Sequence, residues 1–487
     1  MNRVKRVHLL HTNDLHSHLD QAGKIYTQVK SLRKQFEEQG EPYYLLDIGD
    51  HMDRFRLETE GTDGRVNRAL LERTGYDMVT FGNNELLTFS KEQLGMLYDD
   101  APFSVVSTNV FDVSGMERPD WIVPYEWKDA GGIRICFLAA TIPYPRVYEM
   151  MGWQVKNPFP LIKKMVQTLR KEADIIVLLS HLGLGNDRLL AEQMDGIDII
   201  IGAHTHHLLE KAEKVGNTYL AAAGKFGQAV GQVTATFDEV TRSVRDVTAC
   251  CHFVKDQISE ESIDLLMNRY KERAEQNLAQ PVVCLQEPLT IDWNQESPFA
   301  NLLADSIRDW VGADMALVNS GQLLCDLPKG TVTQEMIHQS CPHPINPVLV
   351  EISGKDLKNT LEESLLTEFQ QKPIRGFGFR GETLGTISVS GIKVWFDPGR
   401  KPYEKITSIR VGEKEEEWKK EETYLVGMID MFMFGAGYLS LKKGRLIKYF
   451  LPEFLRDLLA YQLKKPVAVE RCKKRRFIKG GGHERTE

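Results

Sequence analysis

Near its start the chain reads Val7-His8-Leu9-Leu10-His11-Thr12-Asn13-Asp14-Leu15-His16, an apolar run that leads directly into polar side chains. The apolar part is typical of a buried β-strand. Side chains two apart in an extended segment point the same way, so Asp14 and His16 can face a common point. One such pair is weak evidence of a site, because polar residues at strand ends are usually just hydrogen-bonded. The same succession recurs, however, further along the chain.

Strand-like and helical stretches alternate through the first half of the chain. Apolar residues Ile25, Val29, Leu32 and Phe36 recur at helical spacing, and the pattern stops before Gly40. Further apolar runs typical of strands cover residues 43–48, 78–81, 175–179 and 197–201, and alternating residues over 230–249 predict a closing strand pair. This alternation predicts a layered α/β domain.

Each predicted strand ends in side chains that can bind a metal ion. Because ligands of an open α/β sheet bind outside the carboxyl ends of its strands, we expect these side chains to lie close together. They are Asp14, His16, Asp50, Asn83, His181, His204 and His206. Seven donors exceed the needs of one tetrahedral ion. Two ions that share a carboxylate are therefore expected, which is the usual arrangement for the hydrolysis of phosphoesters.

Five segments carry a resemblance to a known family. They are Thr12-Asn13-Asp14-Leu15-His16-Ser17-His18, Gly49-Asp50, Gly82-Asn83-Asn84-Glu85, Ser180-His181-Leu182-Gly183 and Gly202-Ala203-His204-Thr205-His206. In order and spacing they resemble the calcineurin-like metallophosphatases, and more closely the 5'-nucleotidase family, which includes UDP-sugar hydrolases and 2',3'-cyclic-nucleotide phosphodiesterases. The resemblance implies a four-layer metallophosphatase β-sandwich with flanking helices.

The family pattern also implies how the ligands divide between two divalent metal ions. One ion would be held by Asp14, His16, Asp50 and His206, and the other by Asp50, Asn83, His181 and His204, with Asp50 as the bridge. Nitrogen and oxygen ligands without thiolate suit Zn, Mn, Fe, Co or Ni. Two such ions would make water hydroxide-like near neutral pH for attack on phosphorus, with Asn83 beside them.

The second half of the chain resembles the C-terminal substrate-binding domain of the same family. The matching segments are Glu296-Ser297 with residues 301–305, 312–314 with 318–321, Ser388-Val389-Ser390-Gly391 and Phe434-Gly435-Ala436-Gly437-Tyr438. We therefore expect a metallophosphatase domain over residues 1–255, a linker helix over 256–281 and an α+β substrate domain over 282–463. A hinge is expected within residues 259–279, and the basic tail, residues 464–487, is predicted to be disordered.

The third ligand block departs from the family pattern. This chain has Asn84 and Leu87 where most of the family has a catalytic histidine and aspartate. An amide donates a hydrogen bond but supplies no proton, and general acid catalysis contributes roughly 10² to 10⁴ in rate. Activity is therefore expected to be slower or limited to good leaving groups. Asn84 and Asn83 are the catalytic candidates, with His51 or His18 as alternative proton donors.

The nucleoside-binding residues of the family also lack counterparts. Its anion-reading arginine is absent from Gly321-Gln322-Leu323-Leu324, its base-stacking aromatic residues fall near Thr386 and Met431, and its ribose-binding aspartate falls near Ala436. A replacement clamp is predicted in a glycine-rich stretch, and the alternative is a plain loop with one packed aromatic ring. The predicted substrate-binding residues are Arg375, Phe377, Phe379 and Arg380, whereas Phe432 and Phe434 are expected in the core.

Length and composition limit the class of protein. The 487 residues exceed the roughly 250 to 300 at which a single core stops growing, so two domains are expected. A net charge of -7 gives no general attraction to a nucleic-acid polymer. The N-terminal apolar run is too short for a signal peptide, and no stretch is long and apolar enough to cross a membrane. A cytoplasmic location without membrane association is therefore expected, and the oligomeric state is left open.

The sequence thus predicts two-metal hydrolysis of phosphoester bonds in a small molecule, with release of phosphate from nucleotides or related phosphomonoesters as the leading hypothesis. One alternative is a phosphodiesterase or pyrophosphatase that acts on cyclic or dinucleotide substrates. The other is a metal-loaded binding protein without catalysis, which the absent dyad and clamp would also fit.

Overall fold

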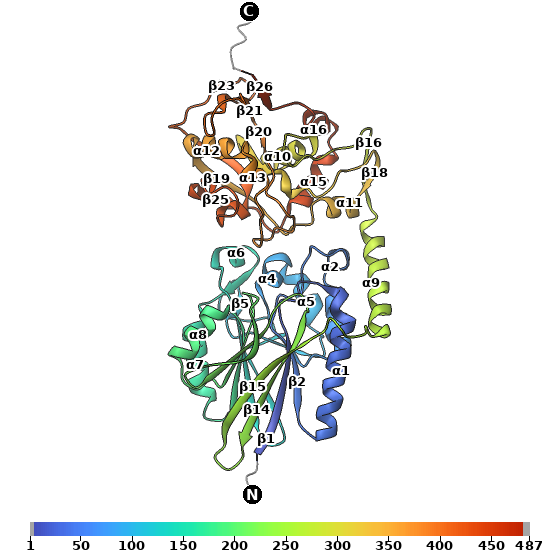
Figure 1. The fold of residues 1–487 in the computed structure, drawn as a ribbon, viewed down its shortest axis with the longest axis vertical. Coiled ribbons are helices and arrows are strands. Elements are labelled where there is room, and N and C mark those ends of the chain that lie inside the picture. Colours follow the sequence, from blue (N-terminus) through green and yellow to red (C-terminus); the bar gives the residue numbers. More distant parts are fainter. Residues whose placement is uncertain (1–3, 481–487) are drawn as a thin grey trace, which may run out of the picture. The chain divides into compact units, whose positions relative to one another are not determined.

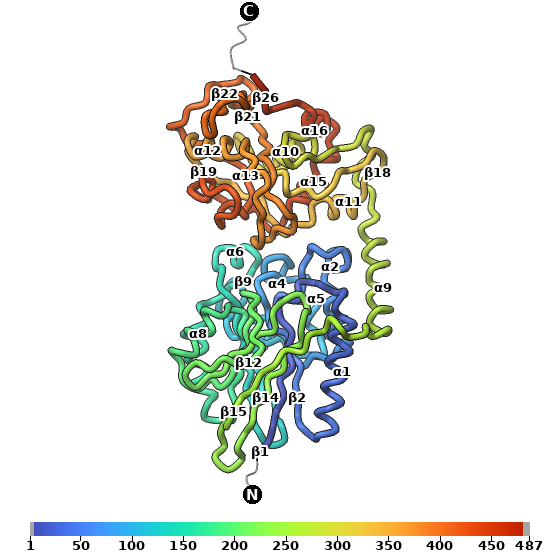
Figure 2. Tube along the Cα trace, in the orientation of Figure 1, coloured from blue at the N-terminus to red at the C-terminus, as the bar shows by residue number. Residues whose placement is uncertain are grey.

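The computed structural model describes residues 4–480, which form two compact units (Figures 1 and 2). Unit 1 ends at Ala274 and unit 2 begins at Glu275. Within the described residues no helix combines the length and the apolar character that a bilayer crossing requires.

Unit 1 is built on two large sheets. The seven-stranded sheet has the order β15 (Ser243–Phe253), β14 (Ala229–Asp238), β1 (Val4–Thr12), β2 (Tyr43–Asp47), β3 (Met78–Val79), β4 (Ser104–Val106), β6 (Ile122–Val123). The six-stranded sheet has the order β12 (Leu208–Val215), β13 (Thr218–Ala223), β11 (Ile199–Gly202), β10 (Ile175–His181), β8 (Arg134–Thr141), β7 (Tyr125–Asp129). A small pair, β5 (Val110–Asp112) and β9 (Trp153–Val155), completes the strands.

The two sheets pack face to face. Since successive side chains of a strand point to opposite faces, a strand can bury one face against the other sheet and its second face under helices. In β10, Val177 and Leu179 are buried against the seven-stranded sheet, in the same core as Leu9 of β1. Ile176 and Leu178 are buried on the other face, among the helices outside the six-stranded sheet. Strands that are apolar on both faces therefore create a sandwich covered by helices.

Helices form the outer layers of unit 1. Figure 1 shows α1 (Ala22–Gln39) on one side of the sheets and α7 (Pro158–Leu169) with α8 (Leu184–Gln193) on the other. The chain leaves α1 through Gly40, which has a left-handed φ of 65°, as the sequence predicts. The remaining helices of this unit are α2 (Leu57–Gly61), α3 (Arg65–Thr74), α4 (Asn83–Thr88), α5 (Lys91–Tyr98) and α6 (Pro145–Met150). The predicted four-layer arrangement is confirmed.

The strands predicted to carry the polar side chains are β1, β2, β3, β10 and β11. In the seven-stranded sheet β1, β2 and β3 run parallel, and in the six-stranded sheet β10 and β11 run parallel. Within each sheet, the carboxyl ends of these strands therefore share one edge. The predicted closing pair is also present, as the antiparallel strands β14 and β15.

The helix α9 (Glu261–Leu278) is the predicted linker helix, and most of it packs on unit 1. Ile263 is buried with Leu19 and Val66 of unit 1. Further along α9, Gly61 lies so close to Ala274 that an added Cβ would meet its Cα at 2.7 Å. The stretch up to Ala274 is thus fixed to unit 1, and a hinge within residues 259–274 would have to break this packing.

Unit 2 is an α+β fold with three sheets. The five-stranded sheet has the order β20 (Ile387–Ser390), β17 (Met315–Asn319), β24 (Thr423–Ile429), β19 (Pro347–Ser353), β25 (Arg445–Tyr449). The four-stranded sheet has the order β23 (Glu416–Glu417), β22 (Ile406–Val411), β21 (Ile392–Phe396), β26 (Phe477–Lys479), and β16 (Pro281–Leu285) pairs with β18 (Gly330–Thr333). The helices are α10 (Pro298–Val311), α11 (Gln334–Ser340), α12 (Gly354–Ser364), α13 (Thr367–Gln370), α14 (Asp430–Met433), α15 (Leu455–Leu463) and α16 (Pro466–Arg471).

The prediction of a disordered basic tail from residue 464 is wrong for the part that the structure describes. Residues 464–480 contain α16 and β26, and β26 pairs in parallel with β21. The Arg476 guanidinium is buried and donates to Asp305 Oδ2 at 2.7 Å. A run of basic residues looks solvated in a sequence, but here its buried member has an acidic partner on α10. Residues 481–487 of the predicted tail lie outside the described residues.

Candidate metal centre

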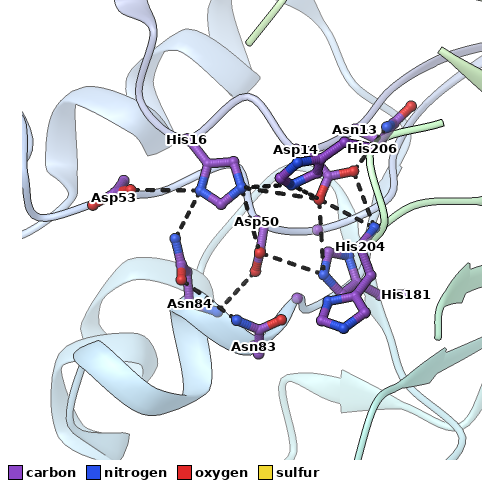
Figure 3. A network of polar contacts seen from close by, with 12 residues as sticks. Asn13, Asp14, His16, Asp50, Asp53, Asn83, Asn84, His181, His204 and His206 are labelled. Carbon is purple, nitrogen blue, oxygen red and sulfur yellow. Dashed lines mark hydrogen bonds and ion pairs between the residues drawn. The ribbon is translucent and has the colours of Figure 1, made fainter. Parts of the chain in front are cut away.

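Side chains from the strand ends of unit 1 converge on one point (Figure 3). Asp14, His16 and His206 form one group of possible ligands, and Asp14, Asp50 and His181 form a second. Within each group the ligand atoms lie within 4.8 Å of one another. Since Asp14 belongs to both groups, the two form a single cluster large enough for two ions.

Asp50 lies between histidines of the two predicted ligand sets. Its Oδ2 is 3.6 Å from His16 Nε2 and 3.4 Å from His181 Nε2. Its Oδ1 accepts a hydrogen bond from the backbone N–H of Asn84 at 2.7 Å. One carboxylate oxygen is therefore held by the backbone, while the other faces both histidines.

His204 and Asn83 lie beside this cluster. The His204 ring centroid is 5.3 Å from that of His181, and its backbone N–H donates to both Asp14 oxygens at 3.1 Å. His204 Nε2 also lies 3.5 Å from the Tyr144 hydroxyl. Asn83 begins α4 and points its side chain toward Asn84 (Figure 3). The structure thus brings together all seven side chains that the sequence singled out as ligands.

The backbone is strained at five of the seven predicted ligand residues. Five of these residues have left-handed φ values: Asp14 (50°), His16 (47°), Asp50 (51°), His204 (72°) and His206 (58°). Residues with a Cβ rarely adopt this conformation, and it persists only where the surrounding structure enforces it. The strain aims side chains from separate loops at one point.

Two glycines allow the loops after β2 and β3 to approach each other. A Cβ on Gly82 would lie 2.0 Å from Asp50 Oδ1, and one on Gly49 would lie 2.3 Å from the Gly82 nitrogen. Gly49 also has a φ of 87°, which favours glycine. Any side chain at either position would displace Asp50.

Two residues that hold the cluster in place were missed by sequence reasoning. The Glu85 carboxylate accepts backbone hydrogen bonds from Asp50 at 3.0 Å, Gly82 at 2.8 Å and Met52 at 2.9 Å. Asn13 donates to Asp14 Oδ2 at 2.9 Å. The contacts of Glu85 with Gly82 and of Asn13 with Asp14 are local, and the first has the spacing of a capping box. The contacts of Glu85 with Asp50 and Met52 join separate segments, which local spacing does not show.

Buried carboxylates make the cluster attract positive charge. Burial lowers the pKa of His181, but the carboxylates of Asp50 and Asp14 outweigh that effect and raise the pKa to about 10. Burial raises the pKa of Asp50, yet His181 and His16 together hold it below its usual range. Metal cations would supply the positive charge that protons on the histidines otherwise provide.

Two buried atoms fit the binding of cations directly. His181 Nδ1 lies 2.8 Å from the carbonyl oxygen of Ile48, which assigns it the role of donor and leaves Nε2 as the basic nitrogen. Among the residues that the structure describes, His181 Nε2 and Asn83 Oδ1 are buried without a hydrogen-bond partner. Imidazole nitrogen and amide oxygen are good ligands for first-row divalent ions. The donor set therefore fits the predicted metals.

The alternative proton donors do not fit that role. His51 is buried and its Nδ1 lies 3.2 Å from the Asn67 amide. Burial lowers the pKa of His51 to about 3, so the ring is uncharged near neutral pH and is not a general acid. His18 packs its ring on Phe226 at a centroid distance of 4.0 Å. Burial lowers the pKa of His18 as well.

In unit 2, the predicted clamp residues have different surroundings. Phe379 is 4% exposed and stacks on His343 with 5.0 Å between centroids, so it is a core residue and the prediction that it contacts substrate is wrong. Phe377 is 51% exposed. It stands at the tip of a two-residue turn, because Gly376 and Phe379 are bridged and both residues between them have positive φ.

Phe434 is the partner that sequence reasoning misplaced. It is 46% exposed, whereas Phe432 is fully buried as predicted. The Phe377 and Phe434 rings lie 6.5 Å apart with 15° between their planes. Of the two predicted arginines, Arg375 is exposed, while Arg380 donates its backbone N–H to His343 Nδ1 at 2.9 Å.

Comparisons with known proteins cover both units. A family model of calcineurin-like phosphoesterases matches residues 7–208, and a model of the C-terminal domain of 5'-nucleotidases matches residues 281–442. The chain is 39% identical over 462 residues to the uncharacterized metallophosphoesterase YunD of Bacillus subtilis (strain 168), covering 94% of this chain and 99% of that protein.

More distant matches extend over most of the chain. A snake venom 5'-nucleotidase of Gloydius brevicauda is 23% identical over 504 residues, covering 88% of this chain and 81% of that protein. The solved structure of Haemophilus influenzae NAD nucleotidase has a TM-score of 0.67 at 16% identity, covering 98% of this chain and 97% of the other. This structural likeness concerns the fold.

Proposed function

Because the chain belongs to the calcineurin-like metallophosphoesterases with a 5'-nucleotidase C-terminal domain, it is a metal-dependent phosphoester hydrolase, and we propose that it releases phosphate from nucleotides or related phosphomonoesters. One observation carries the proposal. Two groups of ligand atoms, each within 4.8 Å, share Asp14 in a buried and strained cluster. A site of this composition is typical of phosphoester hydrolysis with two metal ions.

The proposed ligand sets follow the family pattern. Asp14, His16, Asp50 and His206 would hold one divalent ion, and Asp50, Asn83, His181 and His204 would hold the other. The position of Asp50 Oδ2 between His16 and His181 supports its role as the bridge. When bound, two such cations lower the pKa of water toward neutrality and neutralise charge on phosphoryl oxygens.

The chain's own residues orient the substrate and the ligands. Glu85 fixes the backbone of the Asp50 loop, and the Asn84 N–H fixes one oxygen of the Asp50 carboxylate. The side-chain amides of Asn83 and Asn84 are polar groups beside the cluster, from which they can donate hydrogen bonds to a phosphoryl oxygen. Neither amide supplies a proton to a leaving group.

For the nucleoside part we propose Phe377 and Phe434 as a clamp, with Arg375 as an anion-binding side chain nearby in the sequence. A planar ring stacked between two aromatic faces needs about 7 Å, twice the roughly 3.5 Å contact distance of carbon atoms. The 6.5 Å between these two exposed rings supports such a sandwich after a small adjustment. The relatives named as 5'-nucleotidases support the same class of substrate.

A second candidate function is hydrolysis of phosphodiesters or dinucleotide pyrophosphates. The observation that favours it is Asn84, because without a proton donor at this position a good leaving group is an advantage. Comparing bis-p-nitrophenyl phosphate with p-nitrophenyl phosphate and AMP distinguishes the two. Preference for the diester would establish the second candidate.

We also propose a cytoplasmic role in nucleotide catabolism. All seven cysteines are unpaired, and Cys136, Cys341 and Cys472 are buried thiols. Free thiols are typical of a reducing compartment. Detection of the protein in the cytoplasmic fraction of its native cells tests this proposal, and detection outside the cell would contradict it.

The central test is a phosphate-release assay of purified protein loaded with Mn²⁺ or Co²⁺, against nucleotides, sugar phosphates and cyclic nucleotides. Asp50→Asn is expected to lose at least about 10²-fold in kcat/KM, because the proposed bridge loses its charge. Asp246→Asn removes the same charge from an exposed position of β15 and is expected to keep full activity. Full activity in Asp50→Asn, or metal binding without turnover of any phosphoester, would contradict the proposal.

A further inference from the structure

A buried carboxylate, Asp53, lies behind His16 on the side away from the cluster (Figure 3). Its Oδ2 is 3.5 Å from His16 Nδ1. The Asp53 side chain is held in place, because Oδ1 accepts the backbone N–H of Phe55 at 3.0 Å. Its own backbone N–H donates to Ser17 Oγ at 2.8 Å. This carboxylate therefore has a fixed position relative to the histidine.

The two nitrogens of His16 face different surroundings. Nε2 points into the cluster, 3.6 Å from Asp50 Oδ2 and 3.4 Å from His206 Nε2. An imidazole that binds a cation through Nε2 carries its proton on Nδ1, and that N–H needs an acceptor. The acceptor fixes the tautomer and the direction of the ring.

Asn84 is the nearest polar side chain to His16 Nδ1, but it presents the wrong end of its amide. Its Nδ2 lies 2.8 Å from His16 Nδ1 and 3.4 Å from the carbonyl oxygen of Met52. Its Oδ1 is turned toward Asn83 Nδ2 at 3.5 Å. Once Nδ1 carries the proton, this amide N–H would face a second donor at 2.8 Å, so the Asn84 side chain has to rotate, whereas the Asp53 carboxylate is already held in place as an acceptor.

We propose that Asp53 is the positioning residue of the metal centre, which accepts the Nδ1–H of His16 and aims Nε2 at one of the two ions. The inference rests on the proposed metal centre and adds a residue to it. Since His16 belongs to only one of the two ligand sets, Asp53 acts on one ion and leaves the other to its own ligands. Partners of this kind change metal affinity about 10- to 100-fold when removed.

The test is a titration of metal-free protein with Co²⁺ in competition with a chromophoric chelator. Wild type is expected to bind two ions in two resolvable steps. Asp53→Asn keeps the size of the side chain and is expected to weaken one step by about 10- to 100-fold while the other step stays within twofold. Asp53→Glu, which keeps a carboxylate, is expected to retain more of that affinity and serves if the asparagine variant does not fold.

Two controls separate positioning from a general effect of a buried carboxyl group. Asp174 is another buried acid of unit 1, which accepts the backbone N–H of Arg134 at 2.8 Å and the Arg242 guanidinium at 2.9 Å, and Asp174→Asn is expected to leave both steps unchanged. A double variant with His16→Gln is the second control. If Asp53 acts through His16, Asp53→Asn does not weaken metal binding further in a protein that already carries His16→Gln.

The outcomes separate this inference from the proposed function. Unchanged binding in Asp53→Asn, equal weakening of both steps, or additive losses in the double variant would each overturn the role of Asp53 while two ions still bind the wild type. Wild-type protein that binds fewer than two ions would overturn the two-metal function itself, and the inference with it.

Discussion

Asn84 supplies an amide at the position where the family pattern implies a catalytic histidine. The consequence is a dependence of rate on the leaving group. Across a series of aryl phosphates, kcat/KM is expected to fall steeply as the pKa of the leaving phenol rises, by about 10²-fold between p-nitrophenyl and phenyl phosphate. Steady-state kinetics of the series check this. A flat series in the wild type would reveal a proton donor elsewhere in the site.

Phe377 and Phe434 provide a second test at the level of residues. Removal of one exposed ring by Phe377→Ala or Phe434→Ala is expected to raise KM for a nucleotide about 5- to 150-fold, because base stacking contributes roughly 1 to 3 kcal/mol. KM for ribose 5-phosphate should not change. The matched control is Phe379→Ala, in the same stretch but buried, which should lower stability by about 3 to 5 kcal/mol. An unchanged KM for the nucleotide in Phe377→Ala and Phe434→Ala would contradict the clamp.

At the scale of residues, the sequence predicts local patterns but not contacts between distant segments. That the seven predicted side chains lie together was predictable, because each follows an apolar strand and strand ends share an edge. The contacts of Glu85 with Asp50, of Asp53 with His16 and of Phe434 with Phe377 were not predictable, since these partners lie on other segments. Whether an aromatic ring faces the core or solvent depends on a turn such as that at Phe377, which local periodicity does not describe.

Among the elements, α9 is rigid along most of its length. Ile263 and Ala274 are fully buried on unit 1, whereas the turns beyond them are more exposed. Backbone amides of residues 265–274 are expected to exchange hydrogen at least about tenfold more slowly than those of residues 277–280. Hydrogen exchange followed by mass spectrometry measures this difference. Uniformly fast exchange along α9 would place the expected hinge within the helix after all.

The C-terminal strand β26 closes the four-stranded sheet of unit 2 and brings Arg476 to Asp305. Replacing Arg476 by alanine leaves the buried Asp305 carboxylate with less compensation, and is expected to destabilise unit 2 by about 3 to 5 kcal/mol. Arg475 is exposed, and Arg475→Ala should stay within about 0.5 kcal/mol of the wild type. Urea unfolding of both variants gives the comparison. Equal stability of the two would mean that the ion pair is dispensable.

Helices and strands were easier to predict than the burial and the ion pairs of their side chains. The helical periodicity of α1 and the apolar run of β10 are patterns within one segment, and the structure confirms both predictions. The tail illustrates the opposite case. Its basic residues indicate solvent exposure unless an acidic partner is known, and Asp305 stands about 170 positions earlier in the chain.

At the scale of the whole molecule, the proposed ligands of both ions lie in unit 1. Thermal unfolding is therefore expected to show two transitions, of which only one responds to metal. At an ion concentration about 100 times Kd, binding stabilises by roughly 2.7 kcal/mol, which corresponds to about 5 to 10 °C for a unit of this size. Calorimetry before and after chelation measures the shift. A single transition, or a shift in both, would contradict separate unfolding of the units.

Loops bent into left-handed backbone at five of the proposed ligand positions fix where the donor atoms lie. A bound cation therefore has to accept the donor positions that the backbone sets. Nitrogen and oxygen donors of this kind bind several transition metals, in the order of their intrinsic affinity. Supply around the protein then selects among them. Protein produced in manganese-rich medium and protein produced in zinc-rich medium should therefore contain different metals and differ in kcat.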